Sequence, residues 1–214
     1  RRIGVDISDI AIVNPRHDCE AERRNAYARI LTLKRERNGV TYNDALEKMY
    51  NRNYFGMMMV ETGDADAFIA GVYSAGNQVS EIAREVVGIK EGYSHFATMH
   101  ILNTKRGTFF MADTAINAVS DKSTLIDIVR LAHEKVSFFA QKPVIAMLSY
   151  SNFGSNTADD APNRTADAVK TLHTEYPEII VDGEMQVSYA LDKKLRDDIY
   201  PFTKLKDKDV NTLI

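Results

Sequence analysis

Residues 143–155, which read PVIAMLSYSNFGS, constrain the fold more than any other stretch of the chain. The apolar run from Val144 to Leu148 is typical of a buried parallel strand, and a polar loop follows it before a helical pattern. An open α/β sheet binds ligands where strand carboxyl ends and helix amino ends converge, because backbone N–H groups there face an anion. The candidate ligand-binding residues of the loop are Ser149, Ser151, Asn152, Gly154 and Ser155. The alternative is an ordinary polar connection, since the spacing matches no phosphate-binding motif.

Strand, loop and helix units recur along the chain, which indicates an α/β fold with a largely parallel sheet. The pattern changes near residues 113–120, so we expect two lobes with a cleft: residues 1–113 in lobe I and 114–214 in lobe II. Strands are predicted at residues 10–13, 67–72, 144–148, 178–181 and 210–214, and a β-hairpin at 95–112. Helices are predicted at residues 20–37, 78–87 and 164–176 and around residues 57–60. Three more helices are predicted to start at residue 41, near residues 120–123 and after residue 186. Residues 157–163 are predicted to form a polar, mobile link.

Composition and charge argue against several classes of protein. A net charge of -3 and a pI near 6.0 argue against a dedicated nucleic-acid binder. No apolar run approaches the roughly 20 residues of a membrane span, and no signal peptide opens the chain. The single cysteine, Cys19, fits a reducing compartment, so we expect a cytoplasmic protein without membrane or nucleic-acid partners. The five histidines lack zinc-ligand spacing, and no metal site is predicted.

Four blocks in order, NYFGMMMVETGDADAFIAGV, FFMADTAIN, PVIAMLSYSNFGS and IIVDGEMQ, resemble the phosphotransacetylase family, the phosphate acetyl/butyryltransferases. The resemblance implies a two-lobed, three-layer α/β/α fold, similar to the isocitrate dehydrogenase type, with the active cleft between lobes. The chain starts without an initiator Met and ends on the apolar run VNTLI, so we interpret it as a truncated fragment. The family's remaining catalytic Ser-Arg and Asp would lie beyond Ile214, so we expect the fragment alone to be inactive as an acyltransferase.

A closer resemblance is to the carboxy-terminal phosphotransacetylase-like domain of hybrid NADP-dependent malic enzymes, carried by EGYSHFATMHILNTKRGTFFMADT, MLSYSNFGSN and VDGEMQVSYAL. In those proteins a separate module decarboxylates malate to pyruvate with NADP and a divalent metal, Mg or Mn. The resemblance therefore implies that NADP and the metal bind to the other module, and that this fragment binds no cofactor. The appended domain would regulate and oligomerise the enzyme, with acetyl-CoA or a related CoA ligand as effector and a homo-oligomer as the assembly.

The resemblance carries over site residues one at a time. Active transferases place a Thr-x-Arg motif in the helix after the GDAD strand, and here those two positions are Val79 and Glu81. Replacing a cation by an anion would repel an acyl phosphate, although Arg84 lies one helical turn away and could substitute. No catalytic residue of that motif is therefore intact. Further positions that match family ligand or cleft residues are Arg35, Asp113, Asn117, the Ser149–Ser155 loop, Asp182, Gly183, Glu184 and Gln186.

Three functions remain open at this point. The first is a regulatory, acetyl-CoA-sensing domain of a malic enzyme, favoured by the closer block matches and by Glu81. The second is an active phosphate acetyltransferase, in which the CoA thiolate attacks acetyl phosphate. The third is a purely structural dimerisation lobe, which the amphipathic helices of the second lobe permit.

Overall fold

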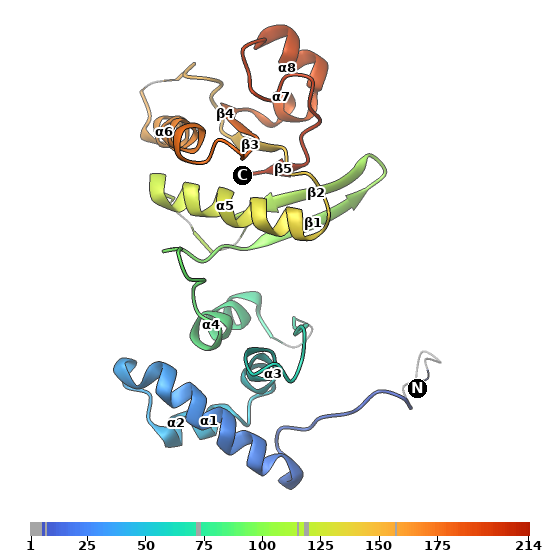
Figure 1. Ribbon diagram of the computed structural model, residues 1–214, viewed down its shortest axis with the longest axis vertical. Coiled ribbons are helices and arrows are strands. Elements are labelled where there is room, and N and C mark those ends of the chain that lie inside the picture. Colours follow the sequence, from blue (N-terminus) through green and yellow to red (C-terminus); the bar gives the residue numbers. More distant parts are fainter. Residues whose placement is uncertain (1–5, 7, 72–73, 115, 118–119, 157) are drawn as a thin grey trace. The chain divides into compact units, whose positions relative to one another are not determined.

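The computed structural model describes residues 6, 8–71, 74–114, 116–117, 120–156 and 158–214 (Figure 1). The chain divides into two compact units, Arg1–Gly88 and Ile89–Ile214. The sequence predicted the boundary between the two lobes later in the chain, between residues 113 and 114. The second unit starts earlier because the hairpin's second strand pairs with the terminal strand of the chain. The assignment of residues 1–113 and 114–214 to lobes stays a prediction.

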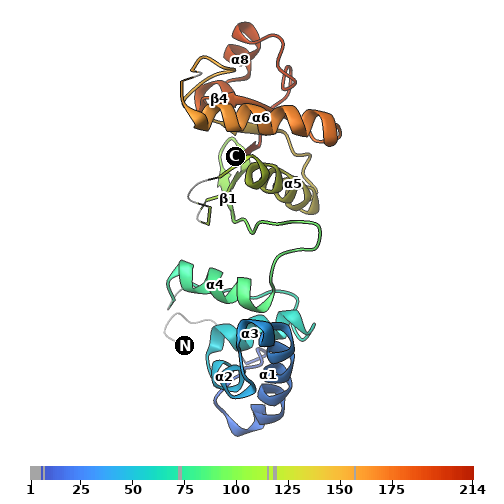
Figure 2. The ribbon, with the colours of Figure 1, turned by 90° about the vertical axis from the view of Figure 1, so that its left-hand side faces the viewer.

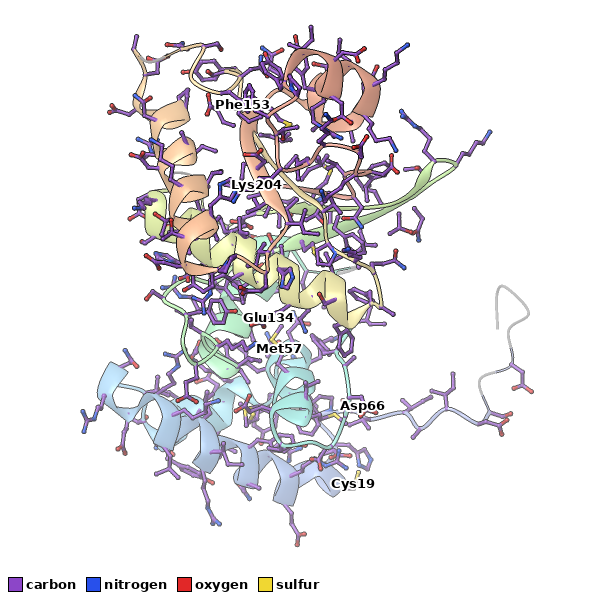
Figure 3. The ribbon with its side chains drawn as sticks, turned by 45° about the horizontal axis from the view of Figure 1, so that its top comes forward. Cys19, Met57, Asp66, Glu134, Phe153 and Lys204 are labelled. Atoms are coloured by element: carbon purple, nitrogen blue, oxygen red, sulfur yellow. The ribbon has the colours of Figure 1, made fainter. Side chains whose placement is uncertain are left out.

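The regular secondary structure among the described residues of unit 1 is all helical. Thr41 caps its second α-helix with a full capping box, since its hydroxyl accepts the Asp44 N–H while the Asp44 carboxylate accepts the Thr41 N–H. Gly39, at φ 81°, ends the preceding helical segment as predicted. Met57 and Met58 are buried in the helical core, as expected (Met57 is labelled in Figure 3). The elements are η1 (Asp18–Glu20), α1 (Ala21–Arg35), η2 (Glu36–Asn38), α2 (Tyr42–Lys48), α3 (Arg52–Glu61) and α4 (Gly76–Val86).

Two predicted strands are wrong for the described part of unit 1. Residues 10–13 are not a strand, and Ile12 is 81% exposed. Residues 67–71 form no strand either, and Ile69 is 94% exposed, while Val72 lies outside the described residues. A strand needs neighbours to satisfy its backbone groups, and no described residue of this unit is paired in a sheet.

Unit 2 is built on a mixed, mostly parallel sheet. The described residues form five strands in the order β1-β2-β5-β3-β4, of which only β1 and β2 pair antiparallel. The predicted hairpin and the predicted parallel strand at 144–148 are therefore confirmed. The strands are β1 (Met99–Thr104), β2 (Gly107–Ala112), β3 (Ile145–Leu148), β4 (Val181–Met185) and β5 (Thr212–Leu213).

Alternate side chains along β3, and Val144 just before it, face two different layers. Ile145 and Met147 pack with α5 (Lys122–Phe138) and α6 (Asp160–Glu175), which lie side by side (Figure 2). Val144 and Ala146 pack into a second cluster that contains α7 (Val187–Leu191) and the segment before β5. This period of two is what a strand covered on both faces produces. The α/β fold with a largely parallel sheet is confirmed, and this unit has helices on both faces of it.

Three element boundaries of unit 2 differ from the predictions. Helix α6 begins at Asp160 rather than 164, because Pro162 in the first turn needs no hydrogen-bond partner. Strand β4 runs through 181–185, so the expected DGEMQ turn is largely strand. The helix predicted after Gln186 is split at Asp192, whose carboxylate caps α8 (Lys193–Ile199). No helix among the described residues has the length and apolar character to span a bilayer.

Candidate functional site

The carboxyl ends of four parallel strands share one edge of the unit 2 sheet, and the predicted loop starts there. Ser149 follows β3, Gln186 follows β4 and Asp113 follows β2 (Figure 1). Ligands of open α/β sheets bind at this edge. The structure therefore brings the loop residues and Gln186 together, with Asp113 and Asn117 at the same edge two strands away.

The loop is folded around one buried carboxylate, that of Glu184. The Ser151 hydroxyl donates to Glu184 Oε1 over 3.0 Å, and the Gly154 N–H donates to the same oxygen over 2.7 Å. Ser151 and Glu184 are each only 1% exposed, so these bonds lie out of water, where a hydrogen bond is stronger than at an exposed site. The second carboxylate oxygen, Oε2, is buried without a partner among the described residues.

Amide groups of the loop are used within the loop itself and by the end of β4. The N–H of Phe153 donates to the Glu184 carbonyl (2.8 Å), that of Asn152 to Ser155 Oγ (2.9 Å), and that of Asn156 to Ser151 Oγ (3.0 Å). These amides therefore hold the loop in shape rather than point outward to an anion, and the Gly154 N–H is taken by the Glu184 carboxylate. The sequence placed Glu184 only within the last family block and did not predict its role in the loop. Nothing in DGEMQ shows which of its two carboxylates turns toward the loop.

Gln186 and Asn152 tie the two strand ends together. The Gln186 N–H donates to Asn152 Oδ1, and its Nε2 donates to the Tyr150 carbonyl, both over 2.8 Å. Phe153, labelled in Figure 3, packs its ring 4.9 Å from that of Tyr200, on the segment after α8. The donors left for a ligand include the hydroxyl hydrogen of Ser149 and the side-chain N–H₂ of Asn152, for which no described residue is an acceptor.

Asp182 has a structural role. Its Oδ2 accepts the Thr203 hydroxyl and the Lys204 N–H, each over 2.7 Å, and its Oδ1 accepts the Gly183 N–H (Lys204 is labelled in Figure 3). The carboxylate is 6% exposed. It therefore anchors the segment after α8 to β4, instead of facing a ligand.

Asp113 and Asn117 form a closed turn at the end of β2. Asp113 accepts the N–H and hydroxyl of Thr98 (2.9 and 2.6 Å) and the N–H and Nδ2 of Asn117 (2.6 and 2.8 Å). Burial opposes ionisation of Asp113, but these hydrogen bonds outweigh it and hold its pKa below the usual range. The Asp-x-x-x-Asn spacing thus serves to fix this strand end.

In unit 1 the structure brings Arg35, Arg84 and Glu81 into one pocket of about 250 Å³. The Arg35 guanidinium donates to the carbonyls of Glu85 (2.7 Å) and Arg84 (2.5 Å), so it caps the last turn of α4. The Arg84 guanidinium has no hydrogen-bond partner among the described residues. Val79 packs against the helical core and leaves the pocket to Glu81. The described lining consists of Arg35, Asn38, Val40, Glu81, Arg84 and Glu85.

The charges of this pocket are mixed. Burial opposes ionisation of Glu85, but hydrogen bonds from Lys48 and Tyr54 outweigh it and lower its pKa, so the carboxylate stays charged. Two guanidinium groups and two carboxylates therefore line the pocket, and Arg84 is its available cation. Over the described part of the chain, no three His, Cys, Asp or Glu side chains are grouped to hold a metal ion.

The profile of the family described as phosphate acetyl/butaryl transferase matches residues 1–214. The chain belongs to the phosphate acetyl/butaryl transferase family. The EutD phosphotransacetylase of Staphylococcus aureus superposes with a TM-score of 0.81 at 27% identity, over 100% of this chain and 64% of that one. This match confirms the α/β fold predicted for the family.

This transferase-family chain is about as similar in sequence to malic enzymes as to phosphate acetyltransferases. It is 31% identical over 211 residues to an NADP-dependent malic enzyme of Escherichia coli, over 96% of this chain and 27% of the enzyme. It is 28% identical over 222 residues to a phosphate acetyltransferase of Treponema pallidum, over 100% of this chain and 65% of that protein. The chain thus spans about a quarter of the malic enzyme and less than two thirds of the acetyltransferase. The resemblance to the transferase family predicted from the four sequence blocks, and the resemblance to malic enzyme domains predicted from the three longer stretches, are both confirmed.

The buried carboxylate yields a prediction for this loop. Glu184→Ala removes the acceptor of the Ser151 hydroxyl and the Gly154 N–H, so we expect about 2 to 4 kcal/mol lower stability in urea unfolding. Glu184→Gln keeps one acceptor oxygen for both donors and should cost less than half as much. The exposed Glu178→Ala is the matched control and should change little. Equal losses at 178 and 184 would show that the loop does not depend on Glu184.

Proposed function

We propose that this chain is a regulatory, ligand-sensing and oligomerising domain of an NADP-dependent malic enzyme, and that it senses acetyl-CoA or a related CoA ligand. The observation that carries this proposal is the position of Glu81 beside Arg84 in the unit 1 pocket. Its further support is the identity to the malic enzyme of Escherichia coli over 96% of the chain.

The charge of Glu81 discriminates between the ligands. Acetyl phosphate carries its phosphate directly on the reacting carbonyl, whereas acetyl-CoA carries its phosphates far from the acyl group. Two unit charges about 4 Å apart interact by ~4 kcal/mol at an effective dielectric of 20, so Glu81 opposes a small phosphate held there for reaction. Arg84 can still pair with one phosphate of a longer CoA ligand.

The catalytic chemistry of such a protein belongs to another module. NADP and a divalent metal, Mg or Mn, would serve oxidative decarboxylation of malate to pyruvate there, in a cytoplasmic homo-oligomer. The part of this chain would be to bind the effector through Arg84 in unit 1. The Ser149 hydroxyl and the Asn152 amide are separate candidate donors of unit 2. Arg35 would contribute by holding the end of α4 that carries Arg84.

The test is malate turnover of the full-length protein, followed as NADPH formation while acetyl-CoA is titrated. We expect a saturable change in rate, and Arg84→Gln should weaken the apparent effector affinity about tenfold through loss of a charged contact. Arg29→Gln, an exposed change outside the pocket, should leave the response unaltered. Where acetyl-CoA changes the affinity for malate or NADP, that ligand shifts the affinity for acetyl-CoA by the same factor. A rate that acetyl-CoA does not alter at millimolar concentration would reject the sensor.

The alternative is an active phosphate acetyltransferase, which the identity of 28% to the enzyme of Treponema pallidum over the whole chain favours. Acetyl-CoA formation from acetyl phosphate and CoA by the full-length protein would establish it. If wild-type activity is undetectable and Glu81→Arg creates it, the reversed charge at position 81 explains the loss.

A further inference from the structure

A second hollow of unit 1, of about 480 Å³, shares no described lining residue with the pocket of Arg35 and Glu81. Its volume falls in the range of small-molecule sites, about 300 to 1,000 Å³. No Asp or Glu is among the described residues that line it. Those residues are Asn14, Pro15, Arg16, Tyr50, Asn51, Arg52, Asn53 and Ser74.

The hollow has two cations that the described part of the protein leaves unused. Neither the Arg16 nor the Arg52 guanidinium forms a hydrogen bond or ion pair with any described residue, and both side chains are exposed. Two unpaired guanidinium groups in the lining of one pocket, with no carboxylate among its described lining residues, create a positive potential. Their planar donor pairs match the oxygen spacing of phosphate.

The wall that carries Arg16 is fixed by a buried arginine. Arg24, which is 5% exposed, donates to the carbonyls of Pro15 and His17, each over 2.7 Å. The same guanidinium lies 4.6 Å from the ring centroid of Tyr50. The backbone beside Arg16 and the ring of Tyr50 are thus held by one group, so this side of the hollow exists before any ligand binds.

Neutral donors complete the hollow. Asn53 Nδ2 donates to Ser74 Oγ over 2.9 Å, so the Ser74 hydroxyl keeps its hydrogen for another acceptor. Asn51 caps α3 by accepting the Asn53 N–H over 2.8 Å. Arg52 is the first residue of this ten-residue helix, so the positive end of the helix dipole lies at Arg52. Charged and neutral donors therefore converge on one space.

We propose that this hollow binds a phosphate group, carried by a small organic molecule or present as the free ion, with Arg16 and Arg52 as its paired cations. The site is independent of the proposed acetyl-CoA contact at Arg84, because the two pockets share no described residue. Its volume exceeds that of a free phosphate ion, which favours a phosphate ester over inorganic phosphate.

The experiment is calorimetric titration of inorganic phosphate and of glycerol 3-phosphate, separately, into the full-length protein at constant ionic strength. We expect saturable binding of at least one probe, weakened about tenfold or more in Arg16→Gln/Arg52→Gln by loss of charge-assisted bonds. Both positions are exposed, so this variant should fold as the wild type does. Tighter binding of glycerol 3-phosphate identifies an ester site, and equal binding identifies a free-phosphate site.

The matched control is Arg29→Gln/Arg37→Gln, which removes the same charge from exposed positions outside both pockets and should bind phosphate as wild type does. Arg84→Gln should also bind it unchanged, whatever happens to the acetyl-CoA response. Arg16→Lys/Arg52→Lys keeps the charge and should lose only part of the affinity. Absence of saturable binding, or an equal loss in the control or in Arg84→Gln, overturns the proposal.

Discussion

Gly183→Ala is expected to lower the stability of unit 2 by about 2 to 5 kcal/mol, through backbone strain and overpacking together. Gly183 has φ 148°, a conformation that L side chains rarely adopt. An added Cβ would lie 2.5 Å from the backbone oxygen of Met147 on the neighbouring strand. The register of β3 and β4 shifts beside this contact, between Met147 and Leu148, so neither strand can move away without breaking the ladder.

Urea unfolding measures this effect as a lower midpoint with an unchanged slope. Gly76→Ala is the control, since no heavy atom lies within 4 Å of its added Cβ and its φ is not positive. It should change stability by less than about 1 kcal/mol. Gly183→Ala should also weaken the contacts of Glu184, the next residue. A variant as stable as Gly76→Ala would show that β4 tolerates a side chain there.

Local signals explain which parts of the fold could be predicted from the sequence. The capping residues Thr41 and Asp44, and Gly39 beyond a helix end, act within a few residues of themselves, and their helices formed where expected. The hairpin around residues 104–107 and the apolar run of β3 are equally local. The recurring strand, loop and helix units indicated the largely parallel sheet, and the family blocks implied a three-layer fold, but neither specified the strand order.

The strands at residues 10–13 and 67–71 failed because an apolar run specifies a strand only where neighbours pair with it, and no described residue does so here. The candidate loop shows a second kind of limit. Its composition predicted free amides for an anion, whereas the structure commits them to acceptors within the loop and to Glu184, which accepts two of them and lies about 30 positions later in the chain. Long-range partners of this kind leave no periodicity to read.

Arg196→Met is expected to destabilise unit 2 by about 3 to 5 kcal/mol, the cost of removing one partner from a buried charged network. The sequence KKLRDDI places Arg196 among residues typical of a solvated helix face, yet it is 0% exposed. Its guanidinium donates to the carbonyls of Ala190 (3.2 Å), Leu205 (2.9 Å) and Lys208 (2.8 Å). Methionine fills much of the volume but leaves these buried carbonyls without donors.

The control for this variant is Lys194→Met, on the same helix but exposed, which should change stability by less than about 1 kcal/mol. Arg196→Lys should fall between the two, because one ammonium cannot reach three carbonyls in the geometry of a guanidinium fork. Leu205 belongs to the cluster that covers β3, so release of its segment should also raise proteolysis near residues 200–210 and loosen Phe153 from Tyr200. Equal stability of the two methionine variants would mean that solvent, and not Arg196, satisfies those carbonyls.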